Sequence, residues 1–137
     1  MEKIRVVILG TGFGRSVQAP AFQRHAEFEL LAIAGSSAGK TRRLAGELGL
    51  KESGADWREL VERLRPDLVS VATPVDLHHP MMLWALDHGA NVLCEKPTAL
   101  HRFQAAEMRD RAASLGRVAA INHEFRFFPA RQLALRV

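Results

Sequence analysis

A chain of 137 residues, 47% of them hydrophobic, can bury one core, but no apolar stretch in it reaches the roughly 20 residues that cross a bilayer. Its net charge of +4 comes with scattered arginines and no interleaved aromatic residues, which argues against a nucleic-acid-binding tract. Its single cysteine, Cys94, excludes an internal disulfide, and its first apolar run is too short for a signal peptide, so we expect a cytoplasmic protein.

The first predicted element is a short apolar strand, Ile4 to Leu9, that leads into three closely spaced glycines, Gly10, Gly12 and Gly14. A continuous apolar run is typical of a parallel strand covered by helices on both faces. Glycines directly after such a strand allow a tight turn and a close approach to a diphosphate, which the next helix binds with its N-terminal amides. The full G-x-G-x-x-G pattern would place the last glycine at position 15, so a tight turn that binds nothing remains an alternative.

The rest of the chain alternates between predicted helices and strands. A helix over Ser16 to His25 contains Pro20 and should start late or kink. Strands are then predicted at 28–34, 50–53, 67–72, 90–94 and 117–122, and helices at 40–48, 57–64 with Asp56 as N-cap, 76–88, 100–115 and from Pro129. This alternation predicts an α/β fold with a doubly wound parallel sheet, the Rossmann dinucleotide-binding fold.

Polar residues and turn residues follow the predicted strands at the point where each strand ends. Because the carboxyl ends of parallel strands meet at one edge of the sheet, we expect these residues to gather around one ligand. They are the glycine turn, Ser36, Ala72 to Pro74, Glu95 to Pro97, and Asn122 to Arg126.

In this order, Gly10-Thr11-Gly12-Phe13-Gly14, Ala72-Thr73-Pro74 with His78, and Cys94-Glu95-Lys96-Pro97 resemble the glucose–fructose oxidoreductase, inositol dehydrogenase and rhizopine-catabolism (Gfo/Idh/MocA) family. That family's proteins are two-domain NAD(P)-dependent oxidoreductases that act mostly on sugars and polyols. The resemblance implies that residues 1–125 are the dinucleotide-binding domain and that residues 126–137 begin a connection to a substrate domain absent from this sequence. We expect such a chain to bind cofactor without turning over substrate alone.

The resemblance implies catalytic roles for Lys96 and Glu95, which would also contact the cofactor. Lys96 would lie near the nicotinamide and the reacting hydroxyl or carbonyl group, where an ammonium can stabilise developing negative charge or relay a proton. Glu95 would orient that region. A solvated lysine at the end of a strand is the alternative for Lys96.

Further cofactor-binding residues are implied by the same resemblance. They are Phe13 in the glycine turn, Ala72, Thr73 and Pro74 as cleft walls, His78 facing the cleft from a helix start, and Arg126 near the nicotinamide end. The alternatives are an ordinary hydrogen bond for His78 and a surface position for Arg126. No metal site is predicted, because His78 and His79 cannot both face one ion from a regular helix.

The end of the second predicted strand bears on the choice of cofactor. A site that prefers NAD usually has an Asp or Glu there, which accepts hydrogen bonds from the ribose 2′-hydroxyl. Residues 34–43 contain no acid, whereas Ser36, Ser37, Lys40 and Arg42 could bind a 2′-phosphate. NADP is therefore the predicted cofactor and NAD the alternative, and a solvated helix face is the other interpretation of Lys40, Arg42 and Arg43.

Two other functions remain open. The chain could be a non-catalytic module that senses NAD(P)(H) or recruits a partner, although a lysine at position 96 argues against a pure sensor. It could also self-associate as a homo-oligomer through apolar surface that a second domain would otherwise cover.

Overall fold

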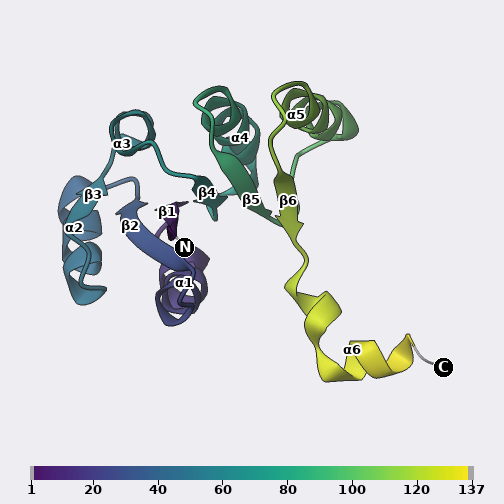
Figure 1. Cartoon of the computed structure of the whole chain (residues 1–137), viewed down its shortest axis with the longest axis horizontal. Helices are drawn as coiled ribbons and strands as arrows, with labels where there is room; N and C mark the ends of the chain where they lie inside the picture. Colours follow the sequence, from purple (N-terminus) through teal and green to yellow (C-terminus); the bar gives the residue numbers. More distant parts are fainter. Residues whose placement is uncertain (1, 136–137) are drawn as a thin grey trace.

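The computed structural model describes residues 2–135, which form a six-stranded sheet in the order β3-β2-β1-β4-β5-β6 (Figure 1). Every neighbouring pair is parallel. The strands are β1 (Ile4–Leu9), β2 (Phe28–Ala34), β3 (Glu52–Gly54), β4 (Leu68–Val71), β5 (Asn91–Glu95) and β6 (Ala119–Asn122). The chain builds outward from β1 to β3 and then crosses back to β4, so the strand order reverses beside β1. The predicted doubly wound parallel sheet is confirmed.

Helices cover both faces of this sheet. α3, α4 and α5 lie over one face, and α1 and α2 lie over the other (Figure 1). The α-helices are α1 (Ala19–Arg24), α2 (Ala38–Glu47), α3 (Trp57–Leu64), α4 (His78–Asp87), α5 (Arg102–Ser114) and α6 (Pro129–Ala134), and the shorter turns are η1 (Gly14–Gln18), η2 (Val75–Leu77) and η3 (Glu124–Phe127).

Alternate side chains of β1 enter two separate apolar cores. Val7 and Leu9 pack into the cluster beneath α3, α4 and α5, whereas Val6 and Ile8 pack into the cluster beneath α1 and α2. All four side chains are fully buried. Burying one such side chain contributes roughly 1.5–3 kcal/mol, so both faces of β1 hold the layers together. This explains why the first strand reads as a continuous apolar run.

The helix after the glycine turn starts irregularly. It opens with the π turn η1, in which the Ala19 amide donates to the Gly14 carbonyl oxygen, and then continues as α1 with Pro20 in its first turn. Proline is tolerated there because the first amides of a helix have no partner within that helix. Helical backbone thus begins at Gly14, two residues before the predicted range, and only the regular α-helix starts late, at Ala19.

The third strand was predicted two residues too early. Its apolar residue Leu50 is not in the strand but packs against the core beneath α1 and α2. Pairing with β2 instead begins where Glu52 lies opposite Ala32. The other strands and the helices 57–64, 76–88 and 100–115 agree with the predicted ranges to within about two residues.

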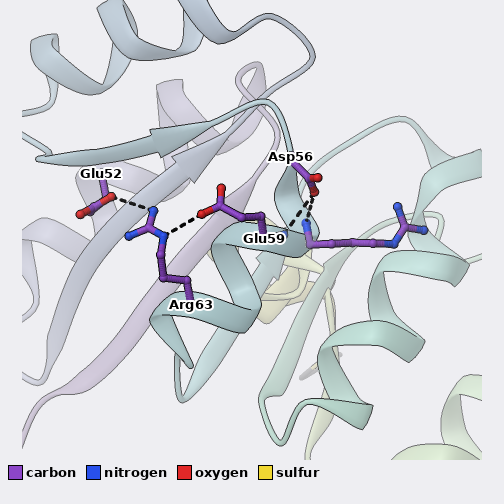
Figure 2. A network of polar contacts seen from close by, with 5 residues as sticks. Glu52, Asp56, Glu59 and Arg63 are labelled. Carbon is purple, nitrogen blue, oxygen red and sulfur yellow. Dashed lines mark hydrogen bonds and ion pairs between the residues drawn. The ribbon is translucent and has the colours of Figure 1, made fainter.

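A polar network fixes α3 against β3 (Figure 2). Asp56 caps the helix, because its Oδ1 accepts from the amides of Arg58 at 2.9 Å and Glu59 at 3.2 Å. Arg63 donates to Glu52 on β3 at 2.9 Å and to Glu59 at 2.8 Å. Both hydrogen bonds raise the pKa of the Arg63 guanidinium, and the bond to Glu52 has the larger effect. The network thereby sets the position of Trp57, the first residue of α3.

The segment after β6 runs away from the sheet as η3 and α6 (Figure 1). It carries large apolar side chains that are mostly exposed within the described residues, among them Phe127, Phe128 and Leu133.

Candidate functional site

A cavity of about 530 Å³ lies at the carboxyl ends of β1, β2 and β4, where the strand order reverses. Ligands of doubly wound sheets bind at this position. Among the residues that line the cavity are six that the sequence analysis singled out, Gly10, Gly12, Ser36, Ala72, Thr73 and Pro74. The topology therefore brings together side chains and turns that are up to 64 residues apart (positions 10 and 74).

The three glycines of the turn differ in what surrounds them. Gly10 has φ +120°, and a Cβ there would lie 2.2 Å from the Ala72 carbonyl oxygen. A Cβ on Gly14 would lie 2.6 Å from Cγ2 of Ile8, because the helix start packs closely on β1. Gly12 has no atom within 4 Å of such a Cβ and opens into the cavity. Gly10 thus allows the tight turn, Gly12 allows a ligand to approach, and Gly14 allows the helix to pack on β1. Gly14 stands one residue before the place of the last glycine in the full G-x-G-x-x-G pattern.

The start of η1 presents unpaired backbone donors. Within residues 2–135, no acceptor takes the amide protons of Gly12, Phe13 and Gly14, whereas the Ser16 amide donates to the Gly12 carbonyl at 3.1 Å. Free amides at a helix N-terminus, together with its positive dipole end, favour an anion. Open space at Gly12 and these donors are the features that a diphosphate requires. The residues present fit a dinucleotide.

The end of β2 supplies the cavity wall nearest to α2. Ser36 lines the cavity, and the carbonyl of Ser37 accepts hydrogen bonds from the backbone and hydroxyl of Thr41 at the start of α2. Lys40 and Arg42 are exposed on this helix, and neither has an ion-pair partner in the described part of the chain. Ser36 is therefore in the cavity lining, whereas Ser37, Lys40 and Arg42 lie beside the cavity, just before or near the start of α2.

Glu95 and Lys96 stand at the end of β5 and do not line this cavity. The Glu95 carboxylate is buried, and its Oε1 accepts from Gln18 Nε2 at 2.8 Å and from Asn122 Nδ2 at 2.5 Å. Lys96 is half-exposed, and its Nζ lies 3.7 Å from Oε1 of Glu124. The two residues are therefore held by different partners, the carboxylate in the interior and the ammonium at the surface.

His78 is buried, with 1% of its surface exposed, and it is not part of the cavity lining. Its Nε2 lies 2.8 Å from the Thr73 carbonyl oxygen, and its Nδ1 lies 3.0 Å from that of Pro97. The ring thus joins the turn after β4 to the turn after β5. This geometry corresponds to the structural alternative for His78 rather than to a side chain facing the cleft.

Two other predicted residues lie away from the cavity. Phe13 borders a separate groove beside Phe125, and the Arg126 guanidinium is exposed, 5.4 Å from the centre of the Phe127 ring. The described residues contain no group of histidine, cysteine or acidic side chains that could hold a metal ion. None of the helices among them is long and apolar enough to cross a membrane.

Sequence reasoning missed several residues of the lining, above all Trp57, Leu77 and Met81. Trp57 could have been found, because Asp56 marks the start of a helix directly after the third strand, at the same edge of the sheet. Leu77 and Met81 carry no such signal, since apolar residues at the start of α4 read as ordinary core.

The family model GFO_IDH_MocA, described as "Oxidoreductase family, NAD-binding Rossmann fold", matches residues 4–123. D-glucoside 3-dehydrogenase of Escherichia coli K12 is 35% identical over 125 residues, which cover 90% of this chain and 36% of the relative. A crystal structure of an NAD-binding oxidoreductase from Klebsiella pneumoniae matches with a TM-score of 0.88 and 31% identity over 98% of this chain and 38% of the other.

A variant of a 3-ketoreductase from Actinomadura kijaniata, crystallised with TDP-benzene and NADP, matches with a TM-score of 0.91 and 26% identity over 98% of this chain. That match covers 43% of the ketoreductase. The chain therefore spans 36–43% of the length of these three proteins.

Proposed function

The chain belongs to the Gfo/Idh/MocA family of oxidoreductases, and from this membership we propose that it binds NADP(H) for hydride transfer to or from a sugar or polyol. The observation that carries the proposal is the cavity at the reversal of strand order, with open space at Gly12 and unpaired amides at the start of η1. The diphosphate would rest on those amides. The adenosine half would extend over the end of β2.

The preference for NADP over NAD rests on Ser36 in the cavity wall and on the adjacent start of α2. A carboxylate at this wall would accept hydrogen bonds from a ribose 2′-hydroxyl and repel a 2′-phosphate. Ser36 supplies a hydroxyl group there instead, and Lys40 and Arg42 on the adjacent α2 have no carboxylate partner in the described residues. Positive charge without a partner favours the doubly charged phosphate.

The nicotinamide, when bound, supplies the site that accepts or donates the hydride. Lys96 Nζ would donate a hydrogen bond to the reacting oxygen of the substrate and transfer a proton at that atom as the oxygen gains or loses negative charge. Glu124, 3.7 Å from Nζ, offers a carboxylate that stabilises the ammonium while no substrate is present. The half-exposed position of Lys96 leaves it accessible to a substrate.

Substrate recognition belongs to the proposal for the whole protein, because this chain spans only a little over a third of its relatives. The named relative acts on a glucoside, which supports a carbohydrate or polyol as the substrate class. From this chain alone we expect cofactor binding without turnover, because half a cleft cannot exclude water from the reaction.

Isothermal titration calorimetry with NADPH and NADH tests this proposal. We expect one site per chain and an affinity for NADPH at least about tenfold higher, which corresponds to about 1.4 kcal/mol. Ser36→Asp should reverse the preference, whereas Ser114→Asp, which adds the same charge at the end of α5, should leave it unchanged. Absence of binding by either cofactor at about millimolar concentration would overturn the proposal.

A further inference from the structure

A line of hydrogen bonds between side chains crosses the sheet on its α1 side. Ser70 of β4 donates from Oγ to Gln18 Oε1 at 2.8 Å, and Gln18 Nε2 donates to Glu95 Oε1 at 2.8 Å. Asn122, at the end of β6, donates to the same Glu95 oxygen at 2.5 Å. Ser70, Gln18 and Glu95 are all buried. Three strands and η1 are therefore joined by hydrogen bonds between side chains, three of which are buried.

The orientation of the Gln18 amide in this line is fixed by its neighbours. An amide has one end that accepts and one end that donates, and an ionised carboxylate can only accept. Oε1 of Glu95 accepts from Gln18 Nε2 as well as from Asn122, which leaves the Gln18 oxygen for the Ser70 hydroxyl. Reversing the amide would place two acceptors against each other in a buried site, at a considerable cost in stability.

Glu95 has no cationic partner. Within residues 2–135, no lysine, arginine or histidine nitrogen lies within 4.0 Å of its carboxylate. The adjacent Lys96 is paired with Glu124 instead. The side-chain amides of Gln18 and Asn122 thus satisfy the buried carboxylate in place of a cationic partner. Their hydrogen bonds hold it in one position at the end of β5.

We propose that Gln18 is a positioning residue for the site. By holding Glu95 at the end of β5, it fixes the exit of that strand and so keeps Lys96 at the nicotinamide end of the cofactor. This inference rests on the proposed function, since it assigns Gln18 to the same cofactor site. Asn122 supports Glu95 from the β6 side, and Ser70 supports Gln18 from the β4 side.

Two variants whose side chains have nearly the volume of glutamine distinguish a positioning role of Gln18 from a role in packing. Gln18→Met fills the space without a donor, and Gln18→Glu places a second carboxylate against Glu95. Two ionised carboxylates at this distance repel each other, whereas in acid they can share one proton, and position 18 then donates a hydrogen bond to Glu95 again. The variants are titrated with NADP⁺ and with 2′,5′-ADP, which carries the 2′-phosphate but no nicotinamide, at about pH 8 and about pH 5.5.

At about pH 8 we expect Gln18→Met to weaken NADP⁺ binding by about fivefold and Gln18→Glu by about tenfold or more, with 2′,5′-ADP binding within about twofold of the unaltered chain. At about pH 5.5 the Gln18→Glu loss should shrink to about twofold, each value being compared with the unaltered chain at the same pH. Thermal unfolding of each variant at both pH values shows that the titrated chains are folded.

Three results would overturn the inference. If both variants bind NADP⁺ like the unaltered chain, Gln18 does not position the site and the proposed function stands. If NADP⁺ and 2′,5′-ADP binding fall equally, or if acid does not restore Gln18→Glu, the role of Gln18 is general packing. If the unaltered chain binds neither ligand, the proposed function itself fails and the inference fails with it.

Discussion

A Cβ atom on Gly10 would lie 2.2 Å from the carbonyl oxygen of Ala72, closer than any such contact in a relaxed protein. Gly10 ends β1 and Ala72 follows β4, so this contact is where the two halves of the sheet meet. The glycine at this position is required by the backbone of the protein itself. Gly12, two residues later, has no atom within 4 Å of a Cβ and is open to solvent and ligand.

The two glycines therefore predict different outcomes for the same substitution. Gly10→Ala must move the turn after β4 and also strains a backbone with φ +120°, so we expect a loss of stability of about 2 kcal/mol or more and no cofactor binding. The melting temperature of Gly12→Ala should lie within about 2 °C of that of the unaltered chain. This variant should nevertheless bind NADPH about tenfold more weakly, because its methyl group occupies space needed by the diphosphate.

Differential scanning fluorimetry and calorimetric titration of both variants give the two readouts. The interpretation is contradicted if Gly12→Ala binds NADPH normally, or if Gly10→Ala remains as stable as the unaltered chain.

The N-cap of α3 is expected to be worth about 1 kcal/mol. Asp56→Ala removes the acceptor of the Arg58 and Glu59 amides, and the melting temperature should fall by a few degrees. Glu62→Ala, on the exposed side of the same helix, is the matched control and should change the free energy of unfolding by less than about 0.5 kcal/mol. Equal effects of the two substitutions in urea titrations would count against the cap.

His78 should stabilise the site region through the two carbonyl groups that it contacts. His78→Leu removes both ring nitrogens that face the Thr73 and Pro97 carbonyl oxygens, and the oxygen that accepts the single N–H of a neutral ring loses its donor, at a cost of about 1–3 kcal/mol if it stays buried. His78→Gln retains amide donors and should lose about half as much. Chemical denaturation of both variants checks this order, and a His78→Leu chain of unaltered stability would disprove the role.

The Cys94 thiol gives a prediction in pH. Burial, and to a lesser extent the charge of Glu95, raises the pKa of this thiol from 9.0 to about 11. The unfolded chain therefore releases the proton at a lower pH than the folded chain. The contribution of this thiol to stability is complete below about pH 9 and is lost as the pH rises from about 9 to about 11.

Cys94→Ala removes this dependence, so the free energy of unfolding of the variant should fall less steeply with pH above about 9 than that of the unaltered chain. The comparison concerns slopes, because the alanine also leaves a cavity that lowers stability at every pH. Parallel slopes in urea titrations across this range would show that the thiol does not titrate differently in the folded state.

The sequence was sufficient to predict the sheet and the edge at which the site lies. Apolar runs such as Val6 to Leu9 are typical of buried parallel strands, and strands alternating with helices leave few topologies. The glycine turn and Ala72 to Pro74 could thus be placed together before their contacts were known. The start of the third strand was harder to predict, because Leu50 is apolar like a strand residue but lies before the strand and packs against the core beneath α1 and α2.

Side-chain partners could not be predicted from the sequence in the same way. Gln18 and Glu95 are 77 residues apart, and nothing near Gln18 indicates that its amide would be buried against a carboxylate. The resemblance to the family implied that His78 faces the cleft from the start of a helix. Its ring is buried instead, since two backbone carbonyls from separate turns converge on it. Such contacts depend on tertiary structure and leave no local pattern.

The central claim is that a dinucleotide binds at the reversal of strand order, and amide proton–nitrogen correlation spectra of the labelled chain during an NADPH titration test it most directly. We expect the largest shifts at the unpaired amides of Gly12, Phe13 and Gly14, followed by those of Ser36 and Thr73 in the cavity lining. The groove beneath α5, lined by Met108 and Ala112, should be unaffected. Shifts confined to that groove, or none at saturating NADPH, would contradict the claim.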